Sequence, residues 1–168
     1  MGKTNFVALE LPEALINELH EVAQWIHTEF TDINFIPMER NSIHMTLCFL
    51  GNILIGKKKE TIEEINKLIY NFPSDRHKNI VLTFDNFCLF PEIKQNLVVA
   101  KFKCHKSFID DTIKFKKEFV KFGTTEENWF SPHVTLGKIQ NKNNDTHIDL
   151  KKIPKIQETL IPISSVLI

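Results

Sequence analysis

The chain has 168 residues, of which 42% are hydrophobic and 25% are charged, a composition typical of a globular domain that buries a core of its own. Its formal net charge of zero excludes the broad basic field that holds a long nucleic acid by counterion release, so any nucleic-acid substrate should be short or gripped locally. The sequence begins without the pattern of a signal peptide, and no apolar stretch approaches the length of a membrane span, so we expect no membrane association.

The three cysteines are odd in number, form no Cys-x-x-Cys pair and lie in apolar runs. This usage predicts reduced, buried thiols in an intracellular protein, and we expect a cytoplasmic location. We also expect a monomer. The cysteines are Cys48, Cys88 and Cys104.

The first part of the chain predicts two strands and two helices. Alternating apolar residues over 5–11 predict a strand, and Pro12 then opens a helix at a position where its missing N–H costs nothing. Apolar residues recurring three and four positions apart predict an amphipathic helix over 12–30. A second strand is expected over 42–52, and a second helix over 57–70.

The middle of the chain predicts a hairpin and a third helix. Strands over 79–90 and 96–103 flank a short turn, which indicates an antiparallel pair. Aromatic residues spaced along 108–122 mark the inner face of a helix, and Gly123 is expected to stop it.

The last part predicts a strand over 131–139, a polar loop over 140–147 and a closing strand over 159–168. The predicted order is β-α-β-α-β followed by β-α-β-loop-β. In each half, a strand and a helix lead to a strand that carries His-x-Thr-Leu. We therefore expect one α+β domain over 1–168 that contains two pseudo-repeat lobes.

The two His-x-Thr-Leu motifs stand at 44–47 ("HMTL") and 133–136 ("HVTL"). Because side chains alternate along a strand, the His and Thr of each motif share one face, and the apolar neighbours share the other. Each strand is expected to bury its apolar face and to present an imidazole and a hydroxyl together. Two such strands facing each other would surround a groove.

Two imidazoles and two hydroxyls suit phosphoester chemistry. A neutral His activates the nucleophile while a protonated His supplies a proton to the leaving oxygen. Threonine hydroxyls can donate hydrogen bonds to the phosphate oxygens as their charge grows. The ligand spacing of a zinc site, such as His-Glu-x-x-His, is absent, so we expect no metal and no other cofactor.

Paired His-x-Thr-Leu motifs on two strands resemble those of the 2H phosphoesterase superfamily. The stretches "FVALELPEALINEL", "NSIHMTLCFLGNI" and "FSPHVTLGKI" are similar to segments of the bacterial RNA 2′,3′-cyclic phosphodiesterases, also called 2′-5′ RNA ligases. The resemblance extends to eukaryotic and viral enzymes that cut 2′-5′ oligoadenylate. It implies a two-lobed pseudo-symmetric α+β fold, with antiparallel sheets backed by helices around a central groove. It also implies His44 and His133 as the catalytic pair and Thr46 and Thr135 as phosphate-binding residues.

The expected activity is that of a metal-independent phosphodiesterase acting on short RNA, oligoadenylate or a cyclic nucleotide. Two substrate classes remain open at this point, which are 2′,3′-cyclic phosphates and 2′-5′ oligoadenylates. The alternative from another class is a non-catalytic module that binds RNA ends or nucleotides, and 2′-5′ ligation is possible as the reverse reaction.

Other residues near the motifs are weaker candidates. Arg40 precedes the first motif and could meet a phosphate, although a surface role is the simpler interpretation. Trp129 and Phe130 stand directly before the second motif and could stack on a base, as could Phe87 and Phe90. Most of the fourteen phenylalanines are expected in the core.

Overall fold

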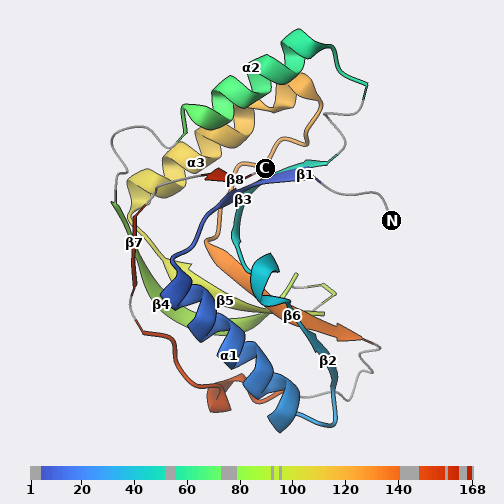
Figure 1. The fold of residues 1–168 in the computed structure, drawn as a ribbon, viewed down its shortest axis with the longest axis vertical. Helices are drawn as coiled ribbons and strands as arrows, with labels where there is room; N and C mark the ends of the chain where they lie inside the picture. The colour runs from blue at the N-terminus through green and yellow to red at the C-terminus, as the bar shows by residue number, and fades with distance from the viewer. Residues whose placement is uncertain are drawn as a thin grey trace.

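In the computed structural model, the described residues form two antiparallel sheets and three α-helices (Figure 1). The fold is therefore α+β, as the sequence predicts. The structure describes residues 5–51, 56–72, 79–91, 93–94, 96–140, 148–157, 159–162 and 166–167.

The smaller sheet carries the first motif and has the strand order β3-β1-β8. Its strands are β1 (Asn5–Leu9), β3 (Met45–Gly51) and β8 (Val166–Leu167). The larger sheet carries the second motif and has the order β2-β6-β5-β4-β7. Its strands are β2 (Asn34–Pro37), β4 (Asn79–Phe90), β5 (Leu97–Lys103), β6 (His133–Gln140) and β7 (Thr159–Pro162).

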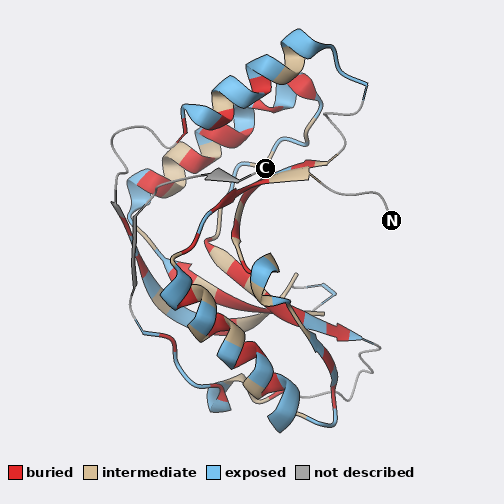
Figure 2. Cartoon of the chain, viewed as in Figure 1, coloured by how far each residue is buried: buried red, intermediate tan, exposed pale blue. Residues whose placement is uncertain are grey.

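The helices bury apolar stripes against these sheets and expose their polar faces (Figure 2). They are α1 (Glu13–Glu29), α2 (Lys59–Tyr70) and α3 (Lys106–Glu118). Short 3-10 turns lie at Arg40–Ser42, Val120–Phe122 and Leu150–Lys152. Gly123 follows the second of these turns with φ of 110°, a left-handed conformation that glycine adopts readily, and so ends the helical segment as predicted.

The repeated pattern in the sequence corresponds to a repeated pairing in the structure. In the first half, β1 precedes α1 and pairs antiparallel with β3, which follows the first motif's histidine. In the second half, β5 precedes α3 and pairs antiparallel with β6, which begins at the second motif's histidine. The two motifs therefore enter different sheets in equivalent places.

Helices α1 and α3 each pack on the sheet that carries the motif of the other half of the chain. Helix α1 belongs to the first half but contacts β2 and β6 of the larger sheet, whereas α3 belongs to the second half and contacts β3 of the smaller sheet. In Figure 1, α2 and α3 lie together on the smaller sheet's side, and α1 lies on the larger sheet's side. The two lobes are consequently interleaved in sequence.

Three elements differ from the sequence prediction. The closing strand predicted over 159–168 is wrong as a single strand, because Thr159–Pro162 form β7 in the larger sheet and Val166–Leu167 form β8 in the smaller. Strand β2 was not expected, because its four residues are too few to show alternation and one of them is a proline. Among the strands that the structure describes, it is the edge strand beside β6 in the larger sheet, a place where proline is tolerated. The predicted strand over 42–52 begins later, since Arg40–Ser42 form a 3-10 turn. The polar loop predicted over 140–147 lies outside the described residues beyond Gln140.

Candidate active site

The two motifs occupy strand starts that face the same cavity. His44 lies directly before β3, and His133 is the first residue of β6. Around His44, the neighbours Ile43 and Met45 are buried, and His44 itself is half-buried. His133 is likewise half-buried beside fully buried Val134. The alternation of faces predicted from the sequence is therefore present in both strands.

A cavity of about 240 Å³ brings both motifs together. It is lined by His44 and Thr46 from the smaller sheet and by His133 and Thr135 from the larger one. A second cavity of about 280 Å³ shares Thr46, His133 and Thr135 with the first, and also Phe49. We treat the two cavities as one groove between the sheets, and call it the motif groove.

Both imidazoles are oriented in the same way. Nδ1 of His44 lies 2.8 Å from the carbonyl oxygen of Ser42, and Nδ1 of His133 lies 2.8 Å from that of Ser131. A carbonyl oxygen only accepts, so Nδ1 carries the proton in each ring and donates it. Nε2 is then the nitrogen that remains for acid–base chemistry in each histidine.

An aromatic ring from another strand of the same sheet flanks each histidine. The Phe6 ring of β1 stacks on His44, with ring centres 4.5 Å apart and planes within 7°. The Phe90 ring at the end of β4 lies 4.9 Å from the His133 ring at 34°. Each contact covers one side of an imidazole and contributes to its burial.

Burial lowers the pKa of both histidines below the ordinary value. For His44 the desolvation of the imidazolium is the main cause, and the hydrogen bond to the Ser42 carbonyl acts in the opposite direction. For His133 desolvation is again the main cause of the lowered pKa. The hydrogen bond to the Ser131 carbonyl raises this pKa, whereas the positive charges of Lys101 and Lys116 lower it further. The environment thus favours the neutral form of both rings.

Lys116 and Glu127 were missed by the sequence reasoning. Both line the motif groove, where the Lys116 ammonium pairs with the Glu127 carboxylate although its side chain is only 9% exposed. Lys116 stands four residues after Thr112 on the buried stripe of α3, so a cation on an apolar stripe was the available signal. Phe6 was missed as well, and nothing in its local sequence indicates that its ring lies on His44.

The weaker candidates are placed as follows. Trp129 is 52% exposed and lines the motif groove together with Phe130 and Phe90. Phe87 is buried in the core, as expected for most phenylalanines. Arg40 bonds to α1, since its Nε donates to Asn17 Oδ1 at 2.8 Å and its guanidinium pairs with the Glu13 carboxylate.

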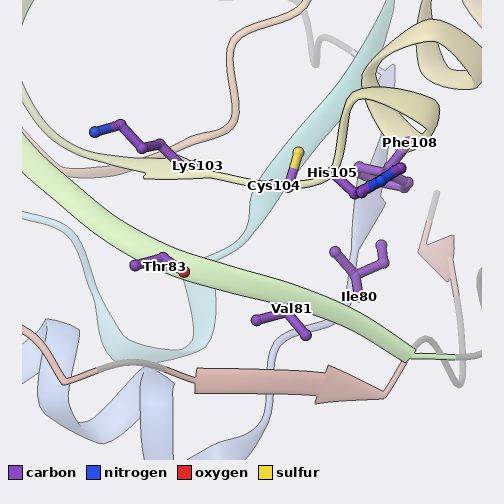
Figure 3. Close-up of a pocket in the computed structure, with 7 residues that line it drawn as sticks. All are labelled: Ile80, Val81, Thr83, Lys103, Cys104, His105 and Phe108. Atoms are coloured by element: carbon purple, nitrogen blue, oxygen red, sulfur yellow. The ribbon is translucent and has the colours of Figure 1, made fainter.

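A larger cavity of about 420 Å³ lies elsewhere, between β4, β5 and the start of α3 (Figure 3). Its polar groups are already engaged, because Lys103 pairs with Asp85 at 2.6 Å and the imidazole of His105 bonds to Ser107. Burial raises the pKa of the Cys104 thiol to about 11, so this thiol is not a nucleophile near neutral pH. The residues that line this cavity contribute one imidazole, that of His105, whereas the motif groove has two (Figure 3).

In the part of the chain that the structure describes, no three His, Cys, Asp or Glu side chains gather closely enough to hold a metal ion. Over the same residues, no helix has the length and apolar content needed to cross a membrane.

Known proteins share this architecture. The profile of the LigT-like phosphoesterases matches residues 9–100, which is more than half of the chain and includes the first motif. The chain belongs to this family. The LigT-like phosphoesterases are 2H phosphoesterases, so the family match places the chain in that superfamily.

Individual LigT-like proteins resemble the chain at low sequence identity. An RNA 2′,3′-cyclic phosphodiesterase of Methanothermobacter thermautotrophicus is 22% identical over 140 residues, covering 83% of this chain and 72% of that protein. E. coli LigT in complex with 3′-AMP superposes with a TM-score of 0.67 at 18% identity, covering 95% of this chain and 84% of LigT. Protein TT0787 of Thermus thermophilus gives a TM-score of 0.59 at 19% identity, with coverage of 95% and 81%. LigT has also been crystallised with ATP.

Proposed function

We propose that this LigT-like phosphoesterase is a phosphodiesterase that opens 2′,3′-cyclic phosphates at the ends of short RNA or on nucleotides. The observation that carries the proposal is the motif groove, where His44, Thr46, His133 and Thr135 line one cavity between two sheets. The similarity to an RNA 2′,3′-cyclic phosphodiesterase favours the cyclic phosphate over the 2′-5′ oligoadenylate linkage. The LigT complexes with 3′-AMP and ATP support a nucleotide as the ligand.

The proposed chemistry uses the two histidines as base and acid in one step. Nε2 of the neutral histidine accepts a proton from water as the water oxygen bonds to phosphorus. Nε2 of the protonated histidine donates its proton to the ribose oxygen as the bond from that oxygen to phosphorus breaks. Both nitrogens are available for these roles, because each Nδ1 is already bonded to a backbone carbonyl.

Thr46 and Thr135 are proposed to bind the non-bridging phosphate oxygens. Each stands two residues after its histidine and lines the same groove. A hydrogen bond from a hydroxyl to a phosphate oxygen strengthens as negative charge accumulates in the transition state. Each such bond to a charged group is worth about 1.5–3 kcal/mol.

No metal ion takes part in the proposed mechanism. The charge that a cation would offset is instead shared between the threonine hydroxyls and the imidazolium. A 5′-hydroxyl that took the place of water in the same ring-opening step would form a 2′-5′ linkage as the bond from phosphorus to the 3′ oxygen breaks, so we propose 2′-5′ ligation as a weaker activity of the same site.

Turnover of a substrate panel tests the proposal. Cyclic 2′,3′-nucleotides, 2′-5′ oligoadenylate and 3′-5′ oligoadenylate are each incubated with the protein, with and without EDTA. We expect hydrolysis of the cyclic nucleotides that EDTA leaves unchanged. Activity that EDTA abolishes and a divalent ion restores would contradict the metal-free mechanism. Binding of nucleotides without turnover would instead favour the non-catalytic module.

A further inference from the structure

One wall of the motif groove is organised around a buried ammonium group. The Lys116 side chain of α3 is 9% exposed, and its Nζ donates to the carbonyl oxygen of Trp129 at 3.1 Å. The same Nζ pairs with Oε2 of Glu127 and lies 5.3 Å from the centre of the Trp129 ring. A single cation therefore fixes both a carboxylate and an indole at the side of the cavity.

The geometry leaves one hydrogen-bond acceptor beside an exposed ring. Lys116 occupies Oε2 of Glu127, and within the described residues no donor meets the other oxygen, Oε1. The Glu127 side chain is 40% exposed and lines the cavity with Trp129. Single-stranded bases are recognised in this manner, by stacking on an aromatic ring and hydrogen bonding along the Watson–Crick edge.

We propose that Trp129 and Glu127 form a nucleobase subsite that selects a base with an exocyclic amino group, cytosine or adenine, over uracil. The proposal rests on the proposed function, because it assigns the base of the nucleotide whose phosphate meets the two motifs. Lys116 is a positioning residue in this subsite, and it acts by holding Oε2 and the Trp129 carbonyl.

Cytosine and uracil differ at the atom that Oε1 would meet. Cytosine presents an amino group at position 4, which donates, whereas uracil presents a carbonyl oxygen there, which only accepts. A carboxylate accepts from the first and repels the second. A hydrogen bond to a charged group is strong enough to give a preference of about tenfold or more.

Glu127→Gln should reverse this preference. The Lys116 ammonium has only donors, so it takes the amide oxygen and leaves the amide NH₂ directed at the base. That NH₂ donates to the carbonyl oxygen of uracil and no longer accepts from cytosine. The matched control is Glu126→Gln, because Glu126 is the exposed preceding residue and does not line the groove.

The test compares kcat/KM for cytidine and uridine 2′,3′-cyclic phosphates in the full-length protein, and the Kd of 3′-CMP and 3′-UMP by calorimetry. We expect a cytidine preference of about tenfold in the wild type and in Glu126→Gln. In Glu127→Gln we expect the order to reverse, and Trp129→Ala should weaken both nucleotides equally. The subsite would be overturned if the wild type gave equal kcat/KM and Kd values for the cytidine and uridine nucleotides. It would also be overturned if Glu127→Gln left the cytidine-to-uridine ratio unchanged.

The two proposals fail in different ways. Cyclic nucleotides hydrolysed without a preference between bases would leave the phosphodiesterase standing and remove the subsite. Selective binding of 3′-CMP that Glu127→Gln reverses, without turnover of any substrate, would retain the subsite and remove the enzymatic function.

Discussion

At the scale of the residue, the two histidines share a common arrangement that the sequence only partly predicts. The His-x-Thr spacing predicts which side chains share a face, and both strands follow it. The carbonyl groups of Ser42 and Ser131 complete the arrangement, because they hold both imidazoles with Nδ1 protonated. A backbone acceptor carries no signature of its own in the sequence, so this part of the site required the structure.

The lowered pKa values of His44 and His133 predict how stability depends on pH. Each folded-state pKa lies below its unfolded value of about 6.5, so the unfolded chain binds these protons more readily. The stability gained from keeping both rings neutral is fully present above about pH 6.5. This stability is lost as the pH falls through the lower pKa values that the two histidines have in the folded protein.

Urea unfolding at pH 7.5 and 5.5 measures this dependence. We expect a lower midpoint at pH 5.5 for the wild type, and a smaller drop for the variant with both His44→Gln and His133→Gln. If the urea midpoint fell equally in the wild type and the double variant, titrating groups other than these two histidines would be its cause.

At the scale of the element, β2 and β6 approach each other closely at Gly137. A Cβ placed there would lie 2.5 Å from the carbonyl oxygen of Ile36 and would overlap the ring of Phe35, which is buried. We expect Gly137→Ala to destabilise the protein by about 1–3 kcal/mol, because a backbone oxygen cannot move aside as a flexible side chain can.

The free energy of unfolding in urea tests this prediction. Lys138→Ala is the control, since Lys138 is the exposed next residue of the same strand. If Gly137→Ala unfolds at the wild-type midpoint, β2 does not pack on β6 as described.

The elements differ in how well their sequences predict them. The long periodic stripe of α1 and the hairpin of β4 and β5 were predicted, because many residues repeat the same signal. The edge strand β2 was not, because its pairing with β6 is a tertiary contact between distant segments. The wall formed by α3 and the segment before the second motif was also missed, since Lys116 and Glu127 meet only after folding.

At the scale of the whole molecule, the chain passes back and forth between the two sheets. It places β1 in the smaller sheet, β2 in the larger, β3 in the smaller and β4 in the larger before β8 returns to the smaller. Neither lobe is a continuous segment that could fold first without the other. We therefore propose that residues 1–168 form a single domain that unfolds as one unit.

The two tryptophans allow each lobe to be followed separately. Trp25 lies in α1 on the larger sheet's side, whereas Trp129 contacts Lys116 of α3. We expect Trp25→Phe and Trp129→Phe to unfold in urea with fluorescence transitions that coincide with their own circular dichroism. Two separated transitions within either variant would indicate lobes that unfold independently.

The pH dependence of kcat/KM is the measurement that bears on the two-histidine mechanism itself. One ring must be protonated while the other is neutral, so the rate should rise and fall with pH around two apparent values that belong to the pair. Because both pKa values are lowered in the folded protein, we expect the maximum below about pH 6.5.

The measurement is this profile for the hydrolysis of a 2′,3′-cyclic nucleotide by the wild type, His44→Ala, His133→Ala and the double variant, each checked for folding by circular dichroism. We expect a bell-shaped wild-type profile and a loss of at least about a hundredfold in kcat for each single variant. The double variant should be little worse than the poorer single one, since the two groups act as a unit. A folded single variant that retains near-wild-type turnover would rule out the two-histidine mechanism.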